Sequence, residues 1–119
     1  MIGPYLFPTI LRIFQSVIGN ETREQFLAAR GKLPEALVAC VSGGSNHAEM
    51  FYPFGKDEGV KILGAEAGGD GLTTNRHAAT LTDEFKGVLR GVRPYVPQPK
   101  EGQISDTHSV SAGLDYPSV

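Results

Sequence analysis

A short apolar run that ends in a glycine-rich loop is the feature that most constrains how this chain folds. Residues 36–41 are apolar without alternation, which predicts a strand buried on both faces in a parallel sheet. A loop of small residues follows at 42–46, and residues 46–54 predict a helix. Glycines let backbone N–H groups approach an anion, and the helix N-terminus adds positive partial charge. The sequence therefore predicts an anion-binding turn between a strand and a helix.

A second apolar run at residues 60–65 predicts another short strand after the helix. A strand, a helix and a strand in this order favour a right-handed βαβ unit. We expect the α/β class, with a three-layer βαβ unit, a short parallel sheet and the glycine-rich loop at the carboxyl end of the first strand. Ligands of open parallel sheets collect at that edge.

The N-terminal part predicts helix. Apolar residues recur at three- and four-residue intervals from Pro8 onward (Ile10, Leu11, Phe14, Val17 and Ile18). Residues 19–20, Gly-Asn, are expected to interrupt this helix. Thr22 and Gln25 match a capping box for a second helical piece, which Gly31 is expected to end. We expect this region to cover a face of the sheet.

Length and composition exclude several classes of protein. A chain of 119 residues predicts one domain, and a net charge of −2 with scattered Lys and Arg predicts no nucleic-acid partner. The single cysteine, Cys40, excludes an internal disulfide and is expected to be an inert core thiol. No apolar run reaches the roughly 20 residues of a membrane span, and no signal-peptide pattern opens the chain. We expect a cytoplasmic protein without a membrane partner.

Five sequence blocks occur in an order that resembles a known family. They are FQSVIG at 14–19, GGSN at 43–46, MFYPF at 50–54, EAGG at 66–69 and SAGLDYP at 111–117. Together they resemble the second half of a tryptophan synthase β chain. The resemblance implies that residues 1–119 are a single partial domain, a piece of the large, cofactor-binding domain of a type II pyridoxal-phosphate enzyme. The uncapped C-terminal residues 109–119 agree with an expected truncation.

The resemblance implies an activity and a set of site residues. The family makes L-tryptophan from L-serine and indole by a pyridoxal-phosphate-dependent β-replacement, a lyase reaction of amino-acid biosynthesis. Carried over to this chain, the residues around the cofactor phosphate are Gly43, Gly44, Ser45 and Asn46. Asp115 corresponds to a catalytic-site aspartate that orders the closed state with an arginine outside this segment. A site for Na⁺ or K⁺ is implied at backbone carbonyls that include those of Ser42, Tyr116 and Ser118.

The chain also departs from the family. None of its lysines (Lys32, Lys56, Lys61, Lys86 and Lys100) matches the His-Lys-x-Asn motif whose lysine forms the Schiff base. We therefore expect this chain to be inactive alone, because that lysine must be supplied from elsewhere. The implied partners are the remainder of the β chain and the tryptophan synthase α chain. Alone, the chain is expected to be a homo-oligomer or prone to aggregation.

Other interpretations stay open for several of these residues. The glycine loop also fits a tight turn without a ligand, and Ser42 would be strained if its position needs a positive φ. His47 is expected on a partly exposed helix surface, Arg90 in solvent, and Glu66 as a cap of the neighbouring glycine loop. The alternative function is a non-catalytic phosphate-binding or protein-interaction module, a remnant of an enzyme.

Overall fold

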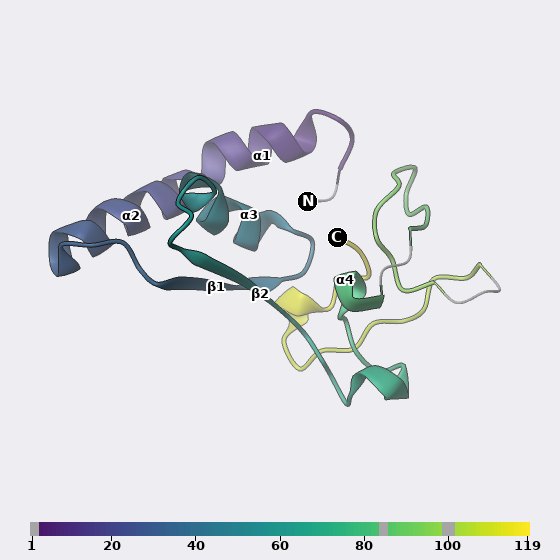
Figure 1. The fold of residues 1–119 in the computed structure, drawn as a ribbon. Helices are drawn as coiled ribbons and strands as arrows, with labels where there is room; N and C mark the ends of the chain where they lie inside the picture. Colours follow the sequence, from purple (N-terminus) through teal and green to yellow (C-terminus); the bar gives the residue numbers. More distant parts are fainter. Residues whose placement is uncertain (1–2, 84–85, 99–101) are drawn as a thin grey trace.

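The computed structural model describes residues 3–83, 86–98 and 102–119. The N-terminal half holds the larger elements, in the order α1 (Phe7–Gln15), α2 (Val17–Arg30), β1 (Ala36–Val41), α3 (Ser45–Phe51) and β2 (Lys61–Glu66). The remainder is mostly loop, with the short helix α4 (Thr80–Asp83) and 3₁₀ turns at Leu72–Thr74 and Ala112–Leu114. A further 3₁₀ turn, Tyr52–Phe54, continues α3. Figure 1 shows the helices and the sheet together, with the looped half extending to one side.

The two strands form a parallel sheet, which confirms the predicted α/β class. Ala36 lies opposite Lys61, and Val41 lies opposite Glu66 at the other end of the register. Helix α3, which connects the strands, packs against β1, and both α1 and α2 pack against α3. The layers therefore follow one another on one side of the sheet: the sheet, then α3, then the α1–α2 pair (Figure 1).

The prediction that the first strand is buried on both faces is wrong. Leu37 and Val41 are buried, whereas Val38 is 66% exposed and Cys40 is exposed. Successive side chains of a strand point to opposite faces, and the helices cover only one of them. The prediction that Cys40 is an inert core thiol is wrong for the same reason.

The hydrophobic core lies between β1, α3 and the turn that precedes β2. Leu37, Phe54 and Val60 form its buried cluster. Three partly buried side chains pack against this cluster: Leu33, Met50 and Phe51. The core therefore joins the strand to the helix that follows the glycine-rich loop, so the loop between them is anchored at both ends.

The N-terminal helix is interrupted at a different residue from the one expected. Ser16 separates α1 from α2, and residues 19–20 lie inside α2. The expected capping box at Thr22 is wrong, because this residue lies within α2, where its hydroxyl donates to the Ile18 carbonyl at 2.7 Å. Gly31 ends α2 as predicted, in the left-handed conformation at φ +69°.

Gly19 lies inside α2 because α3 approaches the helix closely there. It is the buried residue of α2. A Cβ atom at this position would lie 2.5 Å from the Glu49 carbonyl oxygen and 2.8 Å from Cγ of Pro53. Both are parts of a packed element rather than the free end of a side chain. Any larger residue therefore forces α2 away from α3.

We expect Gly19→Ala to lower the free energy of unfolding by about 1–3 kcal/mol through overpacking, although alanine is the better helix former. Chemical denaturation measures the change. Gly59→Ala is the matched control, because a Cβ at Gly59 meets no atom within 4 Å. Equal stability of the two variants would show that α2 and α3 are not in close contact.

An ion pair joins α2 to the turn after α3. The Arg23 guanidinium binds the Asp57 carboxylate through two hydrogen bonds, from Nη1 to Oδ2 and from Nη2 to Oδ1, the latter at 3.1 Å. Nη1 of Arg23 also donates to the Pro53 carbonyl at 3.4 Å. The hydrogen bond from Arg23 holds the pKa of Asp57 below its ordinary value. The pair therefore stabilises the fold while Asp57 is ionised.

This pair predicts a defined loss of stability in acid. Because the pKa of Asp57 is lowered in the folded chain, its contribution is complete above the ordinary carboxyl pKa and disappears as pH falls through the folded value. Asp57→Asn should lower stability near neutral pH and flatten this part of the pH profile, measured by denaturation at several pH values. Glu58→Gln, an exposed neighbour, should leave the profile unchanged. Identical profiles for Asp57→Asn and the parent chain would contradict the prediction.

Candidate functional site

The glycine-rich loop lies at the carboxyl end of β1, where the sequence predicts it. β1 ends at Val41 and α3 begins at Ser45, directly after Gly44. Gly44 has φ +96°, a conformation that residues with a side chain rarely adopt. Among the described non-glycine residues, positive φ occurs at Asn75 and Arg90. Ser42 therefore carries no strain of this kind.

The loop forms one wall of a cleft, and a distant part of the chain forms the other. The cleft has a volume of about 310 Å³ and is lined by Cys40, Ser42, Gly43, Gly44, Ser45, Asn46, Ser111, Gly113 and Leu114. In Figure 1 the short yellow 3₁₀ turn at Ala112–Leu114 lies beside the sheet. Among the described residues that line it, none carries a carboxylate and most are small. A cleft of this kind suits an anionic group near backbone N–H donors.

Asn46 holds the loop against the strand. Its Nδ2 donates to the Cys40 carbonyl oxygen at 3.2 Å and to the Cys40 Sγ at 2.9 Å. Both acceptors belong to β1, so the Asn46 side chain closes the turn instead of standing free in the cleft. This side chain therefore attaches the glycine-rich loop to β1.

The site residues expected after position 114 do not line the cleft. Asp115 is exposed and does not line the cleft, and its backbone carbonyl accepts a hydrogen bond from the Thr107 hydroxyl at 2.6 Å. Tyr116 lies 5.9 Å from the Arg90 guanidinium, measured to the ring centroid. Ser118 is fully buried, and its hydroxyl has no hydrogen-bond partner among the residues that the structure describes. Of the three residues expected at a cation site, Ser42 lines the cleft whereas Tyr116 and Ser118 do not. The roles expected for these residues stay predictions.

Glu66 caps a helix rather than the glycine loop beside it. Its carboxylate accepts hydrogen bonds from the Leu81 N–H at 2.7 Å, the Thr82 N–H at 3.0 Å and the Thr82 hydroxyl at 2.7 Å. These donors lie in α4, so the expectation for Glu66 is wrong. A carboxylate at this position satisfies N–H groups that a short helix leaves unpaired.

His47 and Glu49 follow the loop on α3. His47 is partly exposed, as expected, and burial lowers its pKa while Glu66 opposes the shift. Glu49 is buried, and burial raises its pKa. When the Gln15 side-chain amide is oriented with its nitrogen toward Glu49, that nitrogen donates to both carboxylate oxygens, at 2.6 and 2.7 Å. This contact joins α1 to α3 and has no local signal in the sequence.

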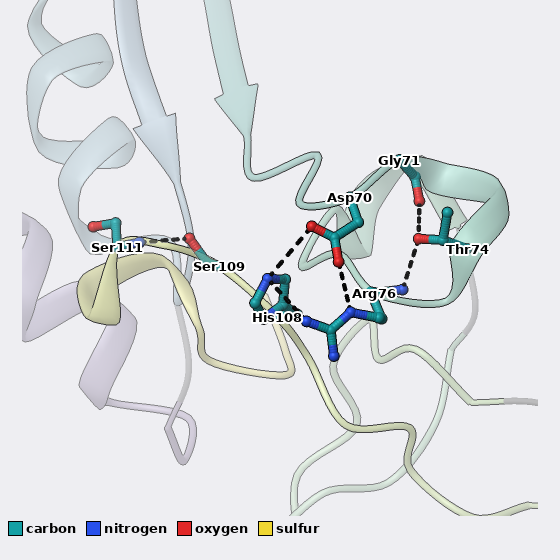
Figure 2. Close-up of polar contacts among 7 residues, drawn as sticks. All are labelled: Asp70, Gly71, Thr74, Arg76, His108, Ser109 and Ser111. Atoms are coloured by element: carbon teal, nitrogen blue, oxygen red, sulfur yellow. Dashed lines mark hydrogen bonds and ion pairs between the residues drawn. The ribbon is translucent and has the colours of Figure 1, made fainter.

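Sequence reasoning also missed a cluster of Asp70, Arg76 and His108, which Figure 2 shows in close-up. Arg76 Nε donates to Asp70 Oδ2 at 2.6 Å, and His108 Nε2 lies 3.7 Å from Asp70 Oδ1. The hydrogen bond from Arg76 is the main reason why the pKa of Asp70 is lowered. His108 is far from the other two in sequence, so no spacing rule brings the three together. Nothing in the chain before folding indicates this contact.

Two further kinds of feature are absent from the described parts of the chain. Within residues 3–83, 86–98 and 102–119, no three His, Cys, Asp or Glu side chains gather closely enough to hold a metal ion. In the same ranges no helix has both the length and the apolar character that crossing a bilayer requires.

The fold and the cleft define the class of this segment: an α/β unit with a glycine-rich loop and a cleft at the carboxyl end of a parallel strand. No family model matches the chain. It is 62% identical to tryptophan synthase of Saccharomyces cerevisiae in an alignment that covers 99% of the chain. The chain spans 17% of the length of that relative. It is thus homologous to a segment of tryptophan synthase, which confirms the resemblance seen in its sequence blocks.

Proposed function

We propose that Gly43, Gly44, Ser45 and Asn46 hold the phosphate of pyridoxal phosphate in a protein that makes L-tryptophan from L-serine and indole. The observation that carries this proposal is the cleft in which the glycine-rich loop meets residues 111–114. The described residues of its lining include no carboxylate, and Gly44 adopts a φ suited to close backbone approach. The similarity to tryptophan synthase supports the identity of the cofactor.

The residues of this chain would bind and orient rather than react. Backbone N–H groups of the loop would donate to the phosphate oxygens, and Asn46 would keep the loop in shape through its bonds to Cys40. Bound pyridoxal phosphate supplies an electron sink for the β-replacement. Asp115 is exposed, so its carboxylate is accessible to an arginine from outside this chain, the role that the resemblance implies. Na⁺ or K⁺ would be held by carbonyls that include those of Ser42, Tyr116 and Ser118.

The lysine that holds the cofactor covalently would come from another part of the whole protein. Lys32, Lys56, Lys61 and Lys86 do not line the cleft, and Lys100 lies outside the described residues. The proposed activity therefore belongs to the intact β chain in its complex with the α chain, in the cytoplasm. Alone, this chain is proposed to bind phosphate without catalysis.

The exposed apolar surface supports the proposal that the isolated chain associates with itself or with the remainder of the β chain. On α1 and α2 the exposed side chains include Phe7, Ile10, Ile13, Phe14, Val17 and Ile18, and Phe14 is 75% exposed. The open face of the sheet adds Val38 and Leu63, which are paired in the register. Apolar surface of this extent marks an interaction site or a tendency to aggregate.

A titration with inorganic phosphate tests the binding loop. We expect phosphate to shift the amide signals of Gly43 and Gly44 in nuclear magnetic resonance spectra and to raise the unfolding temperature, compared with sodium chloride of equal ionic strength. Gly44→Ala should weaken the affinity for phosphate at least ten-fold, because alanine disfavours φ +96°. Both the amide shifts and the rise in unfolding temperature should then require correspondingly more phosphate. Gly31→Ala is the matched control, with a left-handed φ and no atom near its Cβ. Absence of any shift in the parent chain would refute the proposed loop function.

A second experiment tests whether the covalent lysine is missing. Pyridoxal phosphate added to the purified chain, followed by borohydride reduction and peptide mass analysis, should give only scattered, substoichiometric labelling of exposed lysines. One lysine labelled to stoichiometry, with the visible absorbance of lysine-bound cofactor, would overturn the inference that the reactive residue lies outside this chain.

A further inference from the structure

The Asp70, Arg76 and His108 cluster joins two segments that are far apart in sequence. In Figure 2 the Asp70 carboxylate lies between Arg76, in its own loop, and His108, on the segment that leads to the cleft. Arg76 Nε donates to Asp70 Oδ2 at 2.6 Å, and His108 Nε2 lies 3.7 Å from Oδ1. Arg76 Nη2 and His108 Nε2 are 3.4 Å apart. All three side chains therefore contact one another.

Backbone hydrogen bonds hold the two segments that carry this cluster. The loop that carries Asp70 is closed by hydrogen bonds from the Asp70 N–H to the Arg76 carbonyl at 2.8 Å and from the Ala78 N–H to the Ala67 carbonyl at 2.9 Å. The His108 N–H donates to the His77 carbonyl at 3.2 Å. The segment at His108 is thus attached to the Asp70 loop through both its backbone and its side chain.

The same segment continues directly into the second wall of the cleft. The Ser109 hydroxyl accepts a hydrogen bond from the Ser111 N–H at 3.1 Å, and Ser111, Gly113 and Leu114 line the cleft opposite the glycine-rich loop. Figure 2 shows Ser109 and Ser111 beyond His108 on this segment. The position of His108 therefore limits where the wall at Ser111 can lie.

We propose that Asp70, Arg76 and His108 form a positioning clamp that holds residues 111–114 against the glycine-rich loop and so sets the affinity of the cleft for a phosphate group. This inference rests on the proposed phosphate-binding function and adds three residues to it. None of the three lines the cleft. They would act through the segment that joins His108 to Ser111.

The expected size of the effect follows from exposure. The Asp70 and Arg76 side chains are 53% and 61% exposed, so solvent screens their attraction. Exposed ion pairs contribute little, which corresponds to a change of about two- to five-fold in a binding constant. The direction of the change in phosphate affinity is more informative than its size. Removing a carboxylate by itself favours binding of an anion, whereas loss of the clamp weakens it.

The experiment compares Asp70→Asn with Asp106→Asn in the 119-residue chain. Both variants remove one negative charge, and Asp106 is an exposed residue on the same segment, without a side-chain contact to the clamp. His108→Gln removes the other end of the clamp, and Asp70→Glu keeps the carboxylate. Each chain is titrated with inorganic phosphate, with the Gly43 and Gly44 amide signals as the readout. Proton–proton cross-peaks between the glycine-rich loop and residues 111–114 report the position of the wall.

We expect Asp70→Asn and His108→Gln to bind phosphate about two- to five-fold more weakly and to lose cross-peaks between the two walls. Asp106→Asn should bind as well as the parent chain or better, and Asp70→Glu should regain part of the affinity. Cross-peaks between Val38 and Leu63 show in each variant that the sheet is intact. If the parent chain binds phosphate and Asp70→Asn binds equally well, the clamp is wrong while the proposed function stands. If the parent chain does not bind phosphate, the proposed function fails and the cross-peaks alone decide whether the clamp holds the wall.

Discussion

The parallel pairing of β1 with β2 is the constraint on which the rest of the structure depends. Two parallel strands cannot be joined by a tight turn, so the chain must cross over the sheet between them. Helix α3 makes this crossing and packs on β1, with Leu37 buried beneath it. The turn between β1 and α3 is then necessarily at the carboxyl end of the strand. Because α1 and α2 pack on α3 rather than on the sheet, the arrangement of the helices also follows from this crossing.

The sequence was sufficient for the elements whose signal is local. An unbroken apolar run, a glycine loop and a second apolar run predicted β1, the turn and β2 almost at their observed bounds. The burial of β1 on both faces was predicted wrongly, because an apolar run does not reveal what packs on its second face. The helix interruption was misplaced for a related reason. A glycine disfavours helix in isolation, yet Gly19 is retained inside α2 because only hydrogen fits against α3.

The parts of the candidate site also differ in whether a local sequence pattern predicts them. The loop at Gly43 and Gly44 follows from a local pattern, whereas the opposite wall at 111–114 was not predicted, because no spacing rule places this distant segment beside the loop. Glu66 and Asp70 show what neither approach supplies. Their carboxylates are satisfied by groups that reach them only after folding, on α4 for Glu66 and at Arg76 and His108 for Asp70. The sequence around a carboxylate in a loop does not indicate which group it contacts in the folded chain.

The contact between Asn46 and Cys40 links the turn to the chemical state of a sulfur atom. The Cys40 thiol is exposed, and its sulfur accepts the Asn46 amide in addition to the backbone bond. A thiol is a weak, soft acceptor, and an oxidised or alkylated sulfur has a different size and a different charge distribution. A covalent change at that atom would alter half of the attachment by which the amide closes the turn. We therefore expect a modification of the Cys40 sulfur to disturb the shape of the loop as well as the thiol itself.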